Sequence, residues 1–220
     1  MIAENLSTIK KTMPESVLLV AVSKTKPIEL LKEAYQAGQR HFGENKALEM
    51  KDKAEVLPKD ISWHFIGHLQ RNKVKYIIPS VALIHSIDSL RLLQAVNKEA
   101  KKKNRVVDCL LQFHIAEEQT KFGLNYQEAE HLLQSEDYQE LQNIRIVGVM
   151  GMATFTEDTQ QVRREFKELK KIYENLKGSH FAGNTSFKHI SMGMSNDYLI
   201  AIEEGATIVR VGSSIFGKRK

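Results

Sequence analysis

Lys24 is the residue whose type and position best suit covalent chemistry. It follows the apolar run VLLVAV, residues 17–22, which has the length and composition of a buried strand. Alternation along a strand places Lys24 on the same face as Val20 and Val22. An amine surrounded by protein loses hydration, which lowers its pKa and frees the neutral form to attack a carbonyl carbon. The alternative is a surface lysine in a short KTK loop.

Two turns rich in serine and glycine, near the C-terminus, are suited to phosphate binding. SMGMSND stands immediately before a predicted helix, and VRVGSS ends another apolar run. The N–H groups and positive dipole of a helix N-terminus attract anions, and Ser195 adds a hydroxyl donor there. Gly212 lets the backbone approach closely, while Ser213 offers an N–H and a hydroxyl. Turn formation without any ligand is the alternative for each segment.

A reactive lysine opposite a phosphate site indicates an aldehyde ligand that carries a phosphate, and pyridoxal 5'-phosphate meets both demands. Arg210 points inward two residues before Gly212, within reach of the pyridine nitrogen of such a ligand. A guanidinium donates hydrogen bonds and accepts no proton, so the ring nitrogen beside it stays unprotonated. The ring is then a weak electron sink, which argues against demanding carbanion chemistry.

Eight short apolar, β-branched runs must position these residues. The predicted strands are residues 17–22, 41–42, 62–66, 81–86, 106–113, 144–150, 187–191 and 207–212. Apolar residues three or four positions apart predict helices between several of them, over 28–35, 89–103, 162–176 and 198–203. Pro27 and Asp88 are the start signals of the first two helices. The second strand and residues 113–143 are the least defined.

Continuously apolar strands are buried on both faces, so we expect a parallel sheet covered by helices. Eight β/α units in 220 residues fit a (β/α)8 TIM barrel that occupies residues 1–220 as a single domain. A doubly wound open sheet is the rival, but no GxGxxG follows the first strand. In a β/α barrel the active site lies at the C-terminal ends of the strands, where the residues named above are found.

Six ordered blocks of the sequence resemble the YggS/PROSC family of pyridoxal phosphate homeostasis proteins. They are AVSKTKP (21–27), HFGEN (41–45), WHFIGHLQRNK (63–73), VGVMGMA (147–153), HISMGMSND (189–197) and GATIVRVGSSIFGKR (205–219). The resemblance implies a barrel like the alanine racemase N-terminal domain, with pyridoxal 5'-phosphate held as an internal aldimine on Lys24. It also implies the remaining cofactor-binding residues: Asn45 near the cofactor, Met194 and Ser195 with Gly212 and Ser213 around the phosphate, and Arg210 facing the ring nitrogen.

Charge and composition exclude several classes of protein. The net charge of +5 suits anionic partners, but the densest basic run, residues 101–105, ends a predicted helix and has no interleaved aromatic residues, which disfavours nucleic-acid binding. The longest apolar run is strand-sized and no signal peptide is evident, so we expect a cytoplasmic protein and no membrane partner. Cys109 is interpreted as a buried structural residue, with a reactive thiol as the alternative, and His64 and His68 as hydrogen-bonded packing residues, with acid/base groups as the alternative. No metal site is expected.

Length favours a protein that holds the cofactor over one that uses it for rapid catalysis. Racemases with this type of barrel take a second base from a further C-terminal domain and a partner subunit, whereas this sequence ends eight residues after Gly212. We expect a role in intracellular vitamin B6 and amino-acid balance, no strong enzymatic activity, client apoenzymes as partners, and a monomer or weak dimer. The alternatives are an amino-acid racemase or related enzyme, and an RNA- or protein-binding module.

Overall fold

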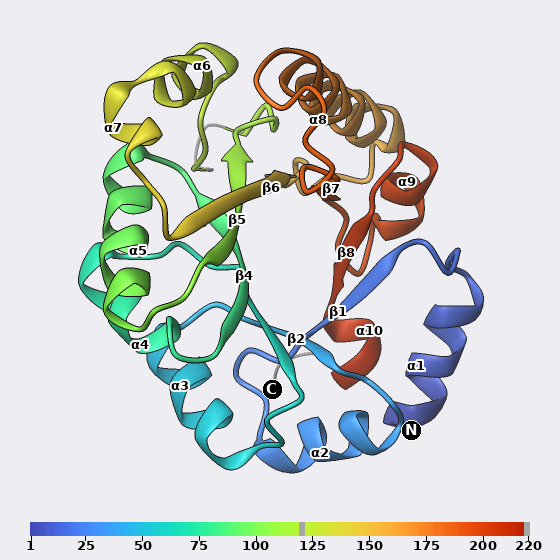
Figure 1. The fold of residues 1–220 in the computed structure, drawn as a ribbon. Helices are drawn as coiled ribbons and strands as arrows, with labels where there is room; N and C mark the ends of the chain where they lie inside the picture. The colour runs from blue at the N-terminus through green and yellow to red at the C-terminus, as the bar shows by residue number, and fades with distance from the viewer. Residues whose placement is uncertain (119–121, 218–220) are drawn as a thin grey trace.

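Eight parallel strands close into a barrel in the computed structural model of this chain, which describes residues 1–118 and 122–217 (Figure 1). The strands follow one another around the barrel in chain order. They are β1 (Leu18–Val22), β2 (His41–Glu44), β3 (Ser62–Phe65), β4 (Val81–Ile87), β5 (Val107–Phe113), β6 (Ile144–Gly151), β7 (His189–Ser191) and β8 (Ile208–Val211). The predicted (β/α)8 TIM barrel is confirmed, and each predicted strand forms within two residues of its expected ends.

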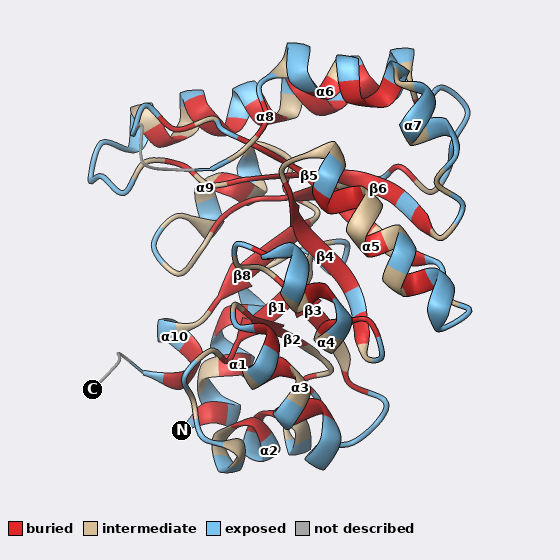
Figure 2. Ribbon diagram, turned by 90° about the vertical axis from the view of Figure 1, so that its left-hand side faces the viewer, coloured by how far each residue is buried: buried red, intermediate tan, exposed pale blue. Residues whose placement is uncertain are grey.

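Helices surround the barrel as an outer ring (Figure 1). They are α1 (Ile2–Lys11), α2 (Ile28–Gln36), α3 (Ala47–Val56), α4 (Val74–Ile77), α5 (Leu90–Lys102), α6 (Tyr126–Gln134), α7 (Glu136–Gln139), α8 (Thr159–Ser179), α9 (Tyr198–Glu203) and α10 (Ser213–Phe216), with a 3-10 turn η1 (Arg71–Lys73) before α4. Figure 2 shows buried residues along the strands and on the inward sides of the helices. No helix among the described residues is long and apolar enough to cross a membrane.

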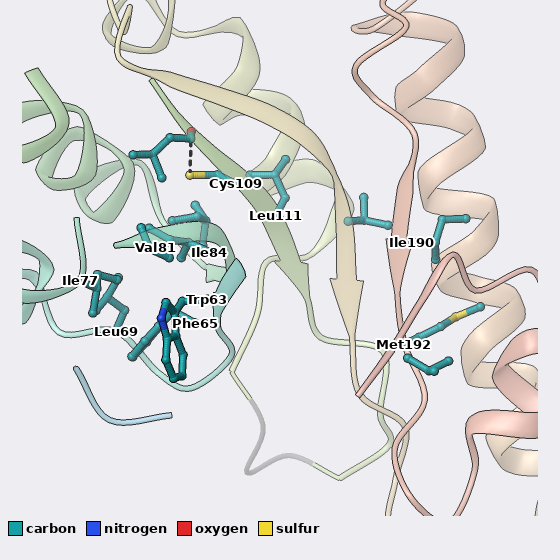
Figure 3. Close-up of a cluster of buried hydrophobic side chains, with 14 of the residues drawn as sticks. Trp63, Phe65, Leu69, Ile77, Val81, Ile84, Cys109, Leu111, Ile190 and Met192 are labelled. Atoms are coloured by element: carbon teal, nitrogen blue, oxygen red, sulfur yellow. Dashed lines mark hydrogen bonds between the residues drawn. The ribbon is translucent and has the colours of Figure 1, made fainter. Parts of the chain in front are cut away.

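Two apolar layers stabilise this arrangement. The larger layer lies between the strands and the helices, and Figure 3 shows part of it around Trp63, Phe65 and Cys109. The smaller layer fills the barrel interior and consists of Val20, Leu83, Leu110, Val147, Met150 and Ile208. Cys109 is fully buried, and burial raises the pKa of its thiol, which confirms its predicted structural position.

Three local features differ from the sequence-based expectation. Helix α5 begins at Leu90 with Ser89 as its N-cap, whereas Asp88 stands one residue earlier and accepts a hydrogen bond from the Ser89 hydroxyl at 3.1 Å. Strand β2 continues to Glu44 because it pairs with both β1 and β3. The undefined stretch contains α6, which starts with a capping box formed by Asn125 and Glu128.

Candidate functional site

A cavity of about 580 Å³ opens at the C-terminal ends of the strands. Its volume is within the range of small-molecule and cofactor sites. The lining includes all seven residues that the sequence predicts for the cofactor site: Lys24, Asn45, Met194, Ser195, Arg210, Gly212 and Ser213. These residues come from four separate segments of the chain, and barrel closure brings them to one place.

Lys24 follows β1 and is flanked by two residues with fixed positions. The hydroxyl of Ser23 donates to Glu44 Oε1 at 2.6 Å, and the Ser23 carbonyl accepts from Lys53 Nζ at 2.8 Å. On the other side of Lys24, the N–H of Thr25 donates to Glu49 Oε1 at 2.6 Å. Thr25 has a φ of 63°, a left-handed conformation that is unfavourable for a β-branched residue. The hydrogen bonds on both sides therefore hold a strained turn at Lys24.

We call Ser23, Glu44, Glu49 and Lys53 the ionic clamp. Lys53 Nζ lies 2.8 Å from Glu44 Oε1 and 2.7 Å from Glu49 Oε1, and the side chains of Glu44 and Lys53 are almost fully buried. Burial raises the pKa of Glu44 to about 7, and the neighbouring Lys53 opposes this shift. Glu44 therefore changes its charge near neutral pH, one residue before Asn45 in the chain.

Asn45 brings an unpaired polar atom to the cavity. Its Oδ1 is buried and has no hydrogen-bond partner among the described residues. Gly67 leaves room for it, because a Cβ at Gly67 would lie 2.4 Å from the Asn45 carbonyl oxygen. A buried acceptor without a partner is costly unless a ligand or water satisfies it. Asn45 is therefore suited to receive a hydrogen bond from a bound molecule.

The turns after β7 and β8 are joined directly. The N–H of Gly212 donates to the Ser195 hydroxyl at 3.1 Å. A Cβ at Gly212 would lie 3.2 Å from the Val22 carbonyl oxygen, so glycine permits a close backbone approach. At the start of α9 the Met194 N–H donates to the carboxylate of Asp197 at 2.5 Å. That backbone N–H, four residues before the first residue of α9, is therefore directed at a side chain of the same turn.

Arg210 is a buried cation with neutral hydrogen-bond acceptors. Its Nη1 donates to the Ser191 hydroxyl at 2.6 Å and its Nη2 donates to the Gly151 carbonyl at 3.1 Å. Burial lowers the pKa of Arg210 to about 10, and the nearby Asp197 opposes this shift. The guanidinium therefore remains protonated at neutral pH and presents its positive charge at the cavity wall.

The two histidines of WHFIGH have different environments. His64 is buried, and its two ring nitrogens lie 2.8 Å from His85 and 3.0 Å from His41, which confirms the predicted hydrogen-bonded packing position. The prediction that His68 is a packing residue is wrong. His68 lines the cavity, is half exposed, and stacks on Phe122 with ring centroids 4.7 Å apart. The two residues differ because His64 lies within β3, whereas His68 lies three residues beyond its last residue, Phe65, in the loop that follows.

Other cavity-lining residues were not predicted from the sequence. They include Gln112, whose Nε2 donates to the Phe122 carbonyl at 2.9 Å, and Phe155, which is 80% exposed. Gln112 could have been identified as a candidate site residue from the sequence, because it is a polar residue inside the apolar run of β5. Phe122 and Phe155 belong to loops, whose positions depend on tertiary contacts. Within the described ranges, no cluster of three or more histidine, cysteine, aspartate or glutamate side chains is arranged for a metal ion.

Comparisons with known proteins agree with this architecture. The model of the alanine racemase N-terminal domain family matches residues 1–220. A pyridoxal phosphate homeostasis protein from Aquifex aeolicus is 42% identical over 204 residues, covering 92% of this chain and 87% of that protein. The protein of the same name from Escherichia coli is 36% identical over 214 residues, covering 94% and 87%.

Solved structures give the same assignment. PipY from Synechococcus elongatus, solved with PLP bound, has a TM-score of 0.88 and 33% identity, with 99% of this chain and 100% of that chain covered. An alanine racemase from Clostridium difficile has a TM-score of 0.77 at 15% identity, covering 99% of this chain and 60% of that one, and shows a shared fold alone. This chain therefore belongs to the alanine racemase N-terminal domain family and, within it, to the pyridoxal phosphate homeostasis proteins.

Proposed function

We propose that this protein binds pyridoxal 5'-phosphate in the cavity and holds it through Lys24, acting in intracellular vitamin B6 homeostasis. The observation that carries this proposal is the convergence of the seven predicted residues on one cavity. The relatives named as pyridoxal phosphate homeostasis proteins and the PLP-bound PipY structure support it. We propose client apoenzymes as its protein partners, a cytoplasmic location, and a monomer or weak dimer as its oligomeric state.

The polar groups around the cavity fit this cofactor. The unpaired Oδ1 of Asn45 offers an acceptor, and the Gly212 turn permits a close approach of the backbone. Ser195 and Ser213 carry hydroxyl groups at the cavity wall, which suit phosphate oxygens because those oxygens only accept hydrogen bonds. Arg210 stands in the same wall as a cationic donor.

Lys24 is the residue we assign to covalent binding. When bound, the cofactor supplies an aldehyde carbon that a primary amine attacks. Lys24 provides the amine from the end of β1, and the ionic clamp fixes the residues on either side of it. Met194, Ser195, Gly212 and Ser213 are assigned to the phosphate end, and Asn45 to a polar contact near the cofactor.

Arg210 favours storage of the cofactor over rapid catalysis. A guanidinium donates to the pyridine nitrogen but does not transfer a proton to it at neutral pH, because its pKa of about 10 keeps it charged. An unprotonated ring withdraws electrons weakly. We infer that the protein stabilises the bound cofactor without efficient cleavage of bonds at an amino-acid α-carbon.

Borohydride trapping tests the covalent assignment. The protein is incubated with pyridoxal 5'-phosphate, reduced with borohydride and mapped by peptide mass spectrometry. We expect a yellow protein and one labelled peptide that contains Lys24, with colour and label both absent in Lys24→Ala. Lys26→Ala is the matched control, because Lys26 also lines the cavity but donates to the backbone carbonyls of Phe216 and Gly217. Retention of the full label in Lys24→Ala would contradict the proposal.

A second measurement separates storage from catalysis. The loaded protein is incubated with alanine or serine in deuterated water, and α-hydrogen exchange is followed by NMR. We expect exchange far below the turnover of about 10 per second that is typical of enzymes. Exchange at that rate would favour the racemase alternative. Transfer of cofactor to an apoenzyme, measured as recovery of the recipient's activity, tests the role of client enzymes.

A further inference from the structure

A chain of five polar side chains runs through the barrel to Arg210. His41 Nδ1 lies 3.0 Å from His64 Nε2, and His64 Nδ1 lies 2.8 Å from His85 Nε2. His85 Nδ1 lies 2.9 Å from the Ser191 hydroxyl, which accepts from Arg210 Nη1 at 2.6 Å. We call His41, His64, His85, Ser191 and Arg210 the histidine chain. It links the cavity wall to a half-buried residue at the N-terminal end of β2.

The histidine chain crosses the interior of the barrel. His41, His64 and His85 come from β2, β3 and β4, which are neighbours in the sheet. Ser191 comes from β7, so its bond to His85 spans the lumen between strands that do not pair. His85 and Ser191 have no exposed surface, and His64 is 3% exposed. Buried polar groups of this kind need partners, because water does not satisfy them.

Donor counting fixes the direction of the hydrogen bonds. Arg210 only donates, so the Ser191 oxygen accepts from it. Among the described residues, the acceptor within reach of the Ser191 proton is Nδ1 of His85. His85 then carries its proton on Nε2 and donates to His64 Nδ1, and His64 donates through Nε2 to His41. The reverse order would leave the Ser191 proton without an acceptor in a buried site.

We propose that Ser191, His85 and His64 are positioning residues for Arg210, which they orient through a one-directional hydrogen-bond chain of neutral groups. His85 takes the Ser191 proton, so a lone pair of the Ser191 oxygen faces the guanidinium. Neutral acceptors hold the guanidinium without cancelling its charge, which leaves that charge available to a ligand in the cavity. This role at the cavity rests on the proposed cofactor site, whereas the proton order does not.

The surroundings favour neutral rings throughout the buried part of the chain. Burial, followed by the nearby His41 and His189, lowers the pKa of His64 to about 3. Burial also places the pKa of His85 well below its usual value, and His64, Arg210 and His189 lower it further. Both rings therefore remain uncharged at neutral pH, as the proton order requires.

The first test uses the protein without cofactor. Long-range proton–nitrogen NMR spectra of nitrogen-15-labelled protein report which ring nitrogen of each histidine carries a proton. We expect His64 and His85 to carry it on Nε2, with Nδ1 bare, from about pH 5 to about pH 8, the range in which an ordinary histidine titrates. A proton on Nδ1 of either ring, or double protonation within this range, would overturn the proposal whether or not the protein binds the cofactor.

The second test breaks the link at Ser191. Ser191→Ala removes the hydroxyl, so we expect His85 to lose its single-tautomer pattern and the visible absorbance band of the pyridoxal 5'-phosphate-loaded protein to shift. Ser191→Thr restores a hydroxyl and should restore both signals. Ser86→Ala is the matched control, because Ser86 is a buried serine next to His85 in the chain whose hydroxyl has no partner among the described residues.

The outcomes distinguish this inference from the proposed function. An unchanged tautomer pattern in Ser191→Ala overturns the hydrogen-bond chain. A changed pattern with an unshifted absorbance band overturns the link to the cavity. Failure of the unmodified protein to bind pyridoxal 5'-phosphate overturns the proposed function and the role of the chain there, while the tautomer measurement still tests the chain itself.

Discussion

The ionic clamp and the histidine chain are both buried polar networks next to the cavity, but they are built from different kinds of group. The clamp pairs formal charges, since Lys53 contacts both Glu44 and Glu49. The chain joins neutral rings and a hydroxyl, and its one permanent charge is Arg210. Charges lose much more hydration energy on burial than neutral groups do, so the clamp depends strongly on each partner being present.

The contributions of the two networks to folding stability change in opposite directions with pH. The pKa of Glu44 is raised from 4.5 to about 7 by burial, so the folded state binds a proton that the unfolded state has lost, and stability from this group falls as pH rises through that window. The pKa of His64 is lowered from 6.5 to about 3, so stability from this group falls as pH drops below 6.5. The following variants test this contrast.

Lys53→Met should have the largest effect on stability. It removes the cation that contacts both Glu44 and Glu49 and a donor from the Ser23 carbonyl, so we expect a loss of about 3 to 5 kcal/mol in urea unfolding at pH 7. Lys51→Met is the matched control on the same helix. The pair between Lys51 and Glu55 is largely exposed and should contribute less than about 0.5 kcal/mol. Equal losses in the two variants would show that the buried ion pairs of the clamp contribute no more to stability than the exposed pair of Lys51 and Glu55.

Glu44→Gln should alter the pH dependence of stability. We expect unfolding free energy in the unmodified protein to decline by up to about 3 kcal/mol between about pH 4.5 and about pH 7 because of Glu44, since one pKa unit corresponds to about 1.4 kcal/mol. Glutamine does not titrate, so the variant should lack this decline. Urea unfolding across that range measures the difference, and parallel curves for both proteins would refute the assignment to Glu44.

His64→Phe tests the neutral network. It leaves His41 and His85 each without one hydrogen-bond partner, which should cost about 2 kcal/mol at pH 7. Phenylalanine takes up no proton, so the loss of stability below pH 6.5 should also be shallower than in the unmodified protein. Thermal and urea unfolding at several pH values provide both readouts. A steeper acid-side loss in the variant would contradict the neutral state of His64.

His41→Asn should have the smallest effect. His41 is half buried at the open end of the chain, where solvent replaces the hydrogen bond to His64. We expect a loss of about 1 kcal/mol or less at pH 7. A loss larger than that of His64→Phe would reverse the order expected for a network that is most sensitive in its buried centre.

Much of the fold and the cavity was predictable because the relevant signals are local. Continuously apolar strands indicate a parallel barrel, and the polar residue after each strand indicates its C-terminal end. Lys24, Ser195 and Gly212 were assigned on this basis, and all of them line the cavity. The N-cap of α5 was placed one residue early, at Asp88, because Asp88 and Ser89 are both residue types that cap helices. Helix α6 was not predicted from the sequence.

The sequence by itself determined the order of strands, the family blocks and the set of residues at the strand ends. Only the tertiary structure decided how the two networks are connected. Ser191 lies 106 residues beyond His85 in the chain and meets it only because the barrel brings β4 and β7, which do not pair, together across its interior. Likewise, the packing of α3 against β2 decides whether Lys53 points to solvent or to the barrel. In this structure it points to the barrel and is buried against Glu44. Alternation and periodicity describe neighbours along the chain, whereas a hydrogen bond across the barrel depends on closure.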